Sequence, residues 1–147
     1  MHNDSISTSV FDIVHSYKMA MRTALNANEI GLNGMSVKCL TFINSSKNCT
    51  ANDIVLFLNR DKAQIARLLK EIIANDWVIK RANPEDKRSQ LLSLTEEGEK
   101  LAKLIAVTHE KVYKKMQGNI SSEELNAFKQ TAAKLAENLQ RFNDPIK

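Results

Sequence analysis

The sequence predicts a mainly α-helical protein that carries one small antiparallel β hairpin. Only four Gly and two Pro occur among 147 residues, so little of the chain suits turns and long helices should dominate. Apolar side chains recur every three or four residues before residue 75 and after residue 95, which is the period of an amphipathic helix. Between these regions, two short apolar segments flank a charged stretch, as in a hairpin.

Composition limits the classes of protein to which this chain can belong. Hydrophobic residues make up 43% and charged residues 26%, which is a globular balance. The net charge of +4 favours an anionic partner without identifying it. No apolar run approaches the roughly 18 residues of a membrane span, and the polar N-terminus lacks a signal peptide. We therefore expect a cytoplasmic protein with no membrane association.

The first three predicted helices precede residue 59. Residues 9–29 form an amphipathic helix, and its apolar seam contains Val10, Val14, Tyr17, Met21, Ala24 and Asn28. Gly31 and Gly34 favour a break over residues 29–34. Ser36 is the expected N-cap of the second helix. Thr50 and Asp53 predict a capping box at the start of the third, which places Cys49 in the preceding loop.

A fourth helix follows a short polar turn at Asn59-Arg60-Asp61, with Asp61 as its N-cap. Its buried face should contain Ile65, Leu68, Leu69 and Ile72, while its basic residues fall mainly on the other side. Two short helices joined by a brief turn, the second carrying exposed basic residues, are typical of a helix-turn-helix.

The hairpin and two long helices complete the predicted fold. The fourth helix ends near Ala74-Asn75-Asp76, Trp77 to Ile79 favour a strand, and residues 90–94 return as a second strand. Thr95 begins the fifth helix and Ser121 caps the sixth. The sixth helix has an unbroken apolar seam, which predicts packing against another subunit and contains Leu125, Phe128, Ala132, Leu135, Leu139 and Phe142.

The charged stretch between residues 59 and 90 contains eight basic and five acidic side chains, a net charge of only +3. A solvated surface would explain such a stretch by itself. The capped helix before it and the charged hairpin after it favour DNA binding, where basic side chains neutralise phosphates and a helix reads the bases. Asp86 lies two residues before Arg88, and we expect it to orient the Arg88 guanidinium.

Residues 61–98 resemble the multiple antibiotic resistance regulator (MarR) family of bacterial winged-helix transcription factors. The resemblance lies in Asp61-Lys62, Arg67-Leu68, Arg81, Asn83-Pro84-Glu85-Asp86-Lys87-Arg88 and Leu94-Thr95-Glu96-Glu97-Gly98. It implies a single domain over residues 1–147, with a winged helix-turn-helix at 36–95, its wing at 77–95, and dimerisation helices at 9–29 and 96–142. It also implies a homodimer on a pseudo-palindromic site in double-stranded DNA.

The resemblance assigns roles to particular residues. Lys62, Gln64 and Arg67 would approach the major groove and Arg88 the minor groove. The full set of predicted DNA-binding residues is Lys62, Ala63, Gln64, Arg67, Lys70, Arg81, Asp86, Lys87 and Arg88. The predicted dimerisation residues are Val10, Val14, Tyr17, Leu125, Phe128, Leu135 and Leu139. The chain departs from the family where Ala63 and Ala66 replace frequent Ser or Thr, Asp76 replaces Gly, and Trp77 replaces an aliphatic residue.

The resemblance also suggests regulation by a ligand. Many relatives are repressors that small aromatic or anionic effectors release, and Tyr17, Met21 and Met35 could line such a pocket or simply belong to the core. Cys39 and Cys49 leave a thiol-based redox regulator as an alternative, although a free Cys commonly packs as a small apolar residue. Another alternative is a dimeric protein-interaction module that does not bind DNA.

No enzyme, metal site or cofactor is expected. The two cysteines form no CxxC pair, and His15 and His109 belong to no HxxxH motif. We therefore expect ordinary hydrogen-bonded or exposed histidines. The sequence contains no glycine-rich phosphate loop and no nucleophile flanked by a recognisable catalytic motif.

Overall fold

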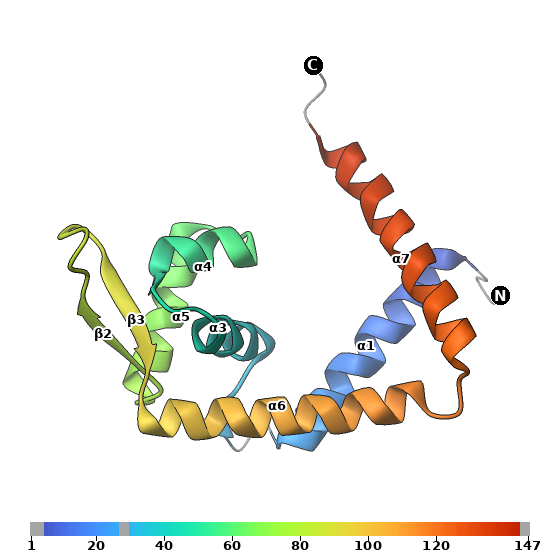
Figure 1. Ribbon diagram of the computed structural model, residues 1–147, viewed down its shortest axis with the longest axis horizontal. Coiled ribbons are helices and arrows are strands. Elements are labelled where there is room, and N and C mark those ends of the chain that lie inside the picture. Colours follow the sequence, from blue (N-terminus) through green and yellow to red (C-terminus); the bar gives the residue numbers. More distant parts are fainter. Residues whose placement is uncertain (1–4, 27–29, 145–147) are drawn as a thin grey trace. The chain divides into compact units, whose positions relative to one another are not determined.

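The computed structural model describes residues 5–26 and 30–144, and it confirms a mainly helical fold with a small sheet (Figure 1). The chain forms two compact units, Met1–Val112 and Tyr113–Lys147. The first unit contains all three strands, most of α6 (Glu96–Gln117), and the helices α1 (Ile6–Leu25), α3 (Gly34–Ser45), α4 (Ala51–Leu58) and α5 (Lys62–Ala74). The second unit contains the end of α6 and α7 (Ser122–Asn143). No helix among the described residues is long and apolar enough to cross a membrane.

Helix α1 spans Ile6–Leu25 and therefore begins and ends three to four residues before the predicted bounds. Ser5 caps it by accepting the backbone N–H of Thr8 at 3.2 Å. Asn26 ends it with a left-handed backbone, φ 54°, which Asn tolerates better than most residues. The seam position predicted at Asn28, and the end predicted at residue 29, lie outside the described residues.

Helix α3 spans Gly34–Ser45, and the predicted cap at Ser36 is wrong. Asn33 is the N-cap, and its Oδ1 accepts the backbone N–H of Ser36 at 2.8 Å and the Ser36 hydroxyl at 3.1 Å. Ser36 thus occupies the third helical position, where a capping side chain finds its donor. Its side chain is buried.

Helix α4 spans Ala51–Leu58 and begins with the predicted capping box. The Thr50 N–H donates to Asp53 Oδ2 at 2.9 Å, and the Asp53 N–H donates to Thr50 Oγ1 at 3.2 Å. The placement of Cys49 in a loop is wrong, because Cys49–Thr50 form a short strand, β1. Two residues show no periodicity, and their partner in the sheet is some forty positions away, so local sequence gives no signal for this strand.

The sheet is antiparallel, with the strand order β1-β3-β2. Strand β2 covers Val78–Ala82 and strand β3 covers Gln90–Leu94, as predicted for the second strand. The hairpin register pairs Val78 with Leu94 and Ala82 with Gln90, while β1 pairs Cys49 with Leu92. The first hairpin strand begins one residue later than predicted and runs on to Ala82.

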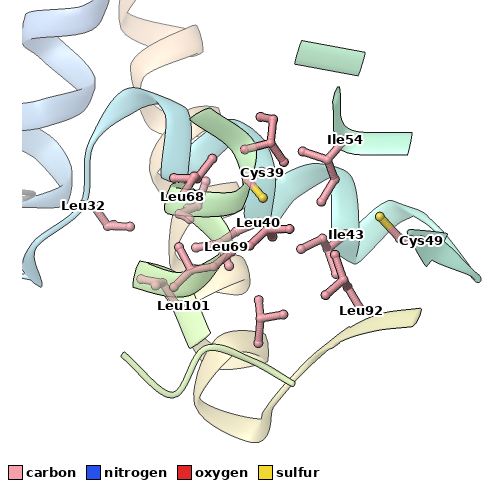
Figure 2. Packing of buried hydrophobic residues seen from close by; sticks show 14 of the residues in the cluster. Leu32, Cys39, Leu40, Ile43, Cys49, Ile54, Leu68, Leu69, Leu92 and Leu101 are labelled. Carbon is pink, nitrogen blue, oxygen red and sulfur yellow. The ribbon is translucent and has the colours of Figure 1, made fainter. Parts of the chain in front are cut away.

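One hydrophobic core joins the elements of the first unit. Its fully buried side chains include Leu40 of α3, Ile54 of α4, Ile65 and Ile72 of α5, and Val78 of β2. Figure 2 shows residues of α3, α5 and β3 gathered in this cluster. Removing each such side chain from water contributes about 1.5–3 kcal/mol, which fixes α5 firmly against α3 and α4.

Helices α6 (Glu96–Gln117) and α7 (Ser122–Asn143) begin and end close to the predicted residues. Gly118, with φ 47°, ends α6. The Ser121 hydroxyl caps α7 by accepting the Glu124 N–H at 3.1 Å. Helix α7 contains no buried residue, so its whole apolar seam lies on the surface.

Candidate nucleic-acid interface

Helix α5 (Lys62–Ala74) presents a polar and basic face to solvent. Asp61 caps it by accepting the Gln64 N–H at 2.8 Å, as predicted. One face is buried through Ile65, Leu68, Leu69 and Ile72, so the remaining side chains must point outward. The exposed residues of this helix include Lys62, Ala63, Gln64, Ala66, Arg67 and Lys70.

Helices α4 and α5 are joined by the tight turn that the sequence predicts at residues 59–61. Asn59 has a left-handed backbone, φ 52°. The Arg60 N–H bonds back to the Val55 carbonyl at 3.3 Å. Both helices then pack against α3 and the sheet, which gives the arrangement of a helix-turn-helix.

The β2–β3 hairpin forms the wing, and local hydrogen bonds hold its tip. Asn83 Oδ1 accepts the Glu85 N–H at 3.0 Å, and Asn83 Nδ2 donates to Ser89 Oγ at 2.9 Å. Asp86 Oδ1 accepts the backbone N–H of Arg88 at 2.9 Å. Asp86 therefore fixes the main chain of the tip, and the expectation that it holds the Arg88 guanidinium directly is replaced by this contact.

A groove of about 1030 Å³ lies between α5, the wing and the start of α4. Its floor is partly apolar, with Leu69, Ile73 and Leu92. Its charged lining is entirely cationic and comprises Lys70, Lys80, Lys87 and Arg88. A concave surface lined by charges of one sign concentrates the field that attracts a polyanion. A smaller recess of about 260 Å³ adjoins Lys62 and Ala66 between α4 and α5.

Lys80 is absent from the predicted DNA-binding residues, although it lines this groove. The sequence could have indicated Lys80, because side chains alternate along a strand and Lys80 follows buried Val78 by two positions, so both point to the same face. Arg81 points to the opposite face by the same rule. Arg81 Nε donates to Ser93 Oγ at 2.7 Å, and its Nη2 donates to the Lys47 carbonyl at 3.4 Å.

The base of the wing explains the Leu-Thr-x-x-Gly pattern. The Thr95 hydroxyl donates to the Asp76 carbonyl at 2.5 Å and accepts the Gly98 N–H at 2.9 Å. A Cβ at Gly98 would lie 1.9 Å from the Trp77 carbonyl oxygen, so only glycine fits there. Asp76, which stands where the family has Gly, adopts a left-handed backbone with φ 62°. Helix α5, the wing and α6 therefore meet at one close contact.

The residues predicted to line an effector pocket lie in the first unit, and none of them lines either groove. Met21 and Met35 are half-buried and pack against the core. The Tyr17 hydroxyl lies 2.7 Å from Nδ1 of His109, which links α1 to α6. His109 is thus hydrogen-bonded and His15 exposed, in agreement with the ordinary roles expected of them.

The two cysteines are buried and poorly suited to redox sensing. Their side chains are 0% and 1% exposed. Burial, with a smaller effect of Cys49, raises the pKa of the Cys39 thiol to about 12. Burial, with a smaller effect of Asp53, raises that of Cys49 to about 11. Because the thiolate is the reactive form, both thiols should be inert near neutral pH. The described residues contain no cluster of His, Cys, Asp and Glu suited to a metal ion.

Several predicted dimerisation residues are exposed apolar side chains. On α1, Val10 and Val14 are 44% and 43% exposed, and Tyr17 is half-buried. On α7, Phe128 and Leu139 are 55% and 65% exposed, while Leu135 is 36% exposed and Leu125 half-buried. Such surfaces are characteristic of helices that acquire a partner.

Comparison with known proteins agrees with this architecture. A sequence profile described as MarR family matches residues 30–89. The chain is 27% identical to the uncharacterized HTH-type transcriptional regulator YdgJ of Bacillus subtilis (strain 168), over 76% of this chain and 68% of YdgJ. Its fold is similar to that of a MepR–DNA complex of S. aureus, with a TM-score of 0.80 and 18% sequence identity over 91% of this chain and 98% of MepR. It is also similar to a crystal structure of MarR, with a TM-score of 0.75 and 22% sequence identity over 97% of this chain and 96% of MarR.

The matched residues contain the helix-turn-helix and most of the wing, and the fold similarity extends to the long helices on either side. Residues 30–89 therefore carry the sequence pattern of the MarR family, and the described chain has the fold of solved MarR structures.

Proposed function

We propose that this protein is a sequence-specific DNA-binding regulator that acts as a homodimer on a pseudo-palindromic operator. The observation that carries this proposal is the groove between α5 and the wing, whose charged lining residues are all cationic. A polyanionic duplex matches such a surface, because each neutralised phosphate releases counterions. The solved MepR relative is a complex with DNA.

Helix α5 is the proposed reader of the major groove. Lys62, Gln64 and Arg67 would approach base edges, Ala63 would contact apolar base groups, and Lys70 would meet phosphates. Lys87 and Arg88 of the wing would reach the adjacent minor groove, where arginine is favoured if the groove is narrow. Asp86 contributes indirectly, since its bond to the Arg88 N–H sets the shape of the tip.

Homodimer formation is supported by the apolar faces on α1 and α7. Val10, Val14, Phe128 and Leu139 are all more than 40% exposed, and α7 has no buried residue at all. A second copy of the chain would cover these faces and place two α5 helices about one helical turn of DNA apart.

The proposed regulation is repression that a small aromatic or anionic effector relieves. Tyr17, Met21 and Met35 are the proposed pocket residues. The support is that Met21 and Met35 are only half-buried against the core, and that methionine side chains adapt readily to a ligand. A redox switch at Cys39 or Cys49 has less support, because burial raises the pKa of both thiols.

The test begins with selection of bound fragments from genomic DNA and measurement of Kd by fluorescence anisotropy at several salt concentrations. Wild-type protein should lose affinity steeply as salt rises. Arg88→Ala should weaken binding by about 1–3 kcal/mol and reduce the salt slope by about one. Lys111→Ala, on an exposed site of α6 outside the groove, is the control of equal charge change.

Equal affinities for Arg88→Ala and wild type would remove the wing from the mechanism. Absence of duplex binding at any salt concentration would instead favour a protein-interaction module. Displacement of bound DNA by aromatic carboxylates, compared between wild type and Met21→Ala, tests the effector proposal separately.

A further inference from the structure

The side chain of Arg81 makes hydrogen bonds that span the sheet. It lies on β2, bonds to Ser93 of β3 at 2.7 Å, and reaches the carbonyl of Lys47, just before β1, at 3.4 Å. Since the strand order is β1-β3-β2, one guanidinium connects the outer strand of the wing to the segment leading into the opposite edge strand. The five N–H donors of arginine in a rigid plane suit such a bridge.

The stem of Arg81 also lies over an apolar side chain. Arg81 is paired across the ladder with Leu91, so both side chains point to the same face of the sheet. Leu91 is only 3% exposed, although neighbouring Leu92 is the residue that faces the main core. The cross-strand neighbours of Leu91 are Arg81 and Thr50. The methylene stem of an arginine covers apolar surface of this kind while its charged end stays in water.

This bridge is placed where it can restrain the wing. Arg81 lies in the last but one pair of the β2–β3 ladder, next to the tip that carries Lys87 and Arg88. Beyond Ala82, the hydrogen bonds that the structure gives for the tip join residues of the tip to one another. We call α3, α4, α5 and β1 together the helix-turn-helix body. Lys47 belongs to this body, in the segment between α3 and β1. The bridge therefore connects the far end of the hairpin to the body that holds α5.

We propose that Arg81 is a positioning residue that braces the wing against the helix-turn-helix body, so that Arg88 meets DNA in a fixed orientation. This inference rests on the proposed DNA-binding function. Arg81 does not line the basic groove, whereas Lys80, Lys87 and Arg88 do. A flexible wing would have to be ordered at the moment of binding, and that ordering lowers affinity.

The test compares three variants with wild type. Ser93→Ala removes the nearest acceptor without changing any charge. Arg81→Lys keeps the charge but cannot form the planar two-point bridge. Arg81→Ala removes both the charge and the bridge. Each of these should weaken operator binding by about three- to tenfold through lost pre-organisation. The slope of log Kd against log salt should stay at the wild-type value, because no phosphate contact is lost.

Two measurements separate this proposal from a direct DNA contact and from a general loss of stability. Hydrogen exchange of the wing amides, residues 83–90, should accelerate in the DNA-free variants while exchange of α5 stays unchanged. The double variant Ser93→Ala/Arg81→Ala should bind no more weakly than Arg81→Ala alone, since both substitutions remove one interaction.

The proposal is overturned if Ser93→Ala binds as wild type while Arg81→Ala lowers both affinity and salt slope, because Arg81 would then contact phosphate. Unchanged wing exchange in all variants would also overturn it. If the proposed DNA-binding function is wrong, the wild-type protein will bind no duplex. The hydrogen-exchange measurement would still decide in that case whether Arg81 braces the wing.

Discussion

At the scale of single residues, Gly98 is the most tightly constrained position in the wing base. An added Cβ would lie 1.9 Å from the Trp77 carbonyl oxygen and 2.9 Å from its carbon. Neither atom belongs to a flexible side chain, so the backbone of α6 or of the wing base must move. Alanine has the better helix propensity by about 1 kcal/mol, but that gain is smaller than the cost of this displacement.

Gly98→Ala should therefore destabilise the protein by about 1–3 kcal/mol, as measured by urea unfolding. Gly34→Ala is the matched control, because an added Cβ there meets nothing within 4 Å and Gly34 is also at a helix start. We expect that control to be neutral or slightly stabilising. Equal stability of both variants would show that the contact between α6 and Trp77 relaxes without cost.

The two thiols give a second prediction at this scale. At pH 7.5, Cys39 and Cys49 should react with a disulfide reagent only as fast as the protein unfolds, since both are buried and their pKa values are raised to about 12 and 11. The unfolded thiols ionise near the ordinary value of 9.0, below the folded values. Stability from the neutral thiols is thus complete below pH 9 and is lost as pH rises toward 11–12.

The double variant Cys39→Ala/Cys49→Ala is the control for the loss of stability above pH 9. It should lose less stability between pH 9 and 12 than wild type does, because it has no thiol to ionise. Rapid modification of either thiol in the folded protein at pH 7.5 would restore the redox alternative.

At the level of elements, the capping box of Thr50 and Asp53 stabilises the N-terminus of α4, the first helix of the helix-turn-helix. Thr50 contributes both to the cap and to strand β1, so one residue joins the sheet to the first helix of the motif. The reciprocal bonds between Thr50 and Asp53 satisfy two backbone donors that would otherwise lack partners.

Thr50→Ala should lower the free energy of unfolding by about 1 kcal/mol, whereas Thr50→Ser should retain most of the cap. Thermal and urea unfolding of the two variants measure the difference. A cost for serine as large as that for alanine would mean that strand packing at this position, and not the cap, stabilises the junction.

The wing illustrates the difference between charge content and charge placement. The stretch from residue 59 to 90 has a net charge of only +3, yet no carboxylate lines the groove. Asp61 caps α5, Asp76 takes the left-handed turn, and Asp86 holds the tip backbone. These three acids have local structural roles, which leaves the cations free to define the groove.

At the scale of the whole molecule, the exposed seam of α7 predicts assembly. Leu135→Asp should shift the protein toward monomers in sedimentation experiments, because a carboxylate in an apolar interface loses its hydration without gaining a partner. DNA affinity should fall with it, since two half-sites could no longer be bound together. Gln130→Asp, an exposed position of α7 outside the seam, is the control for added charge. A tight dimer of Leu135→Asp would assign this seam to contacts within one chain.

Most elements could be predicted from local signals. The caps at Thr50, Asp61 and Ser121, the helical periodicity and the apolar strands are encoded within a few residues of where they act. The predictions were wrong where two nearby residues could both cap a helix, since Asn33 and not Ser36 caps α3. They were also wrong where a strand pairs with a segment remote in the sequence, as β1 does with β3.

Short-range capping, apolar periodicity and the wing motif were enough to predict the helix-turn-helix, the hairpin and the resemblance to the MarR family. Only the tertiary structure showed that Asp86 bonds the Arg88 backbone, that Lys80 lines the groove, and that Arg81 bridges the sheet. The physical reason is that hydrogen-bond partners such as Lys47 and Arg81 become neighbours only after β1 pairs with β3, and no local pattern encodes that long-range pairing.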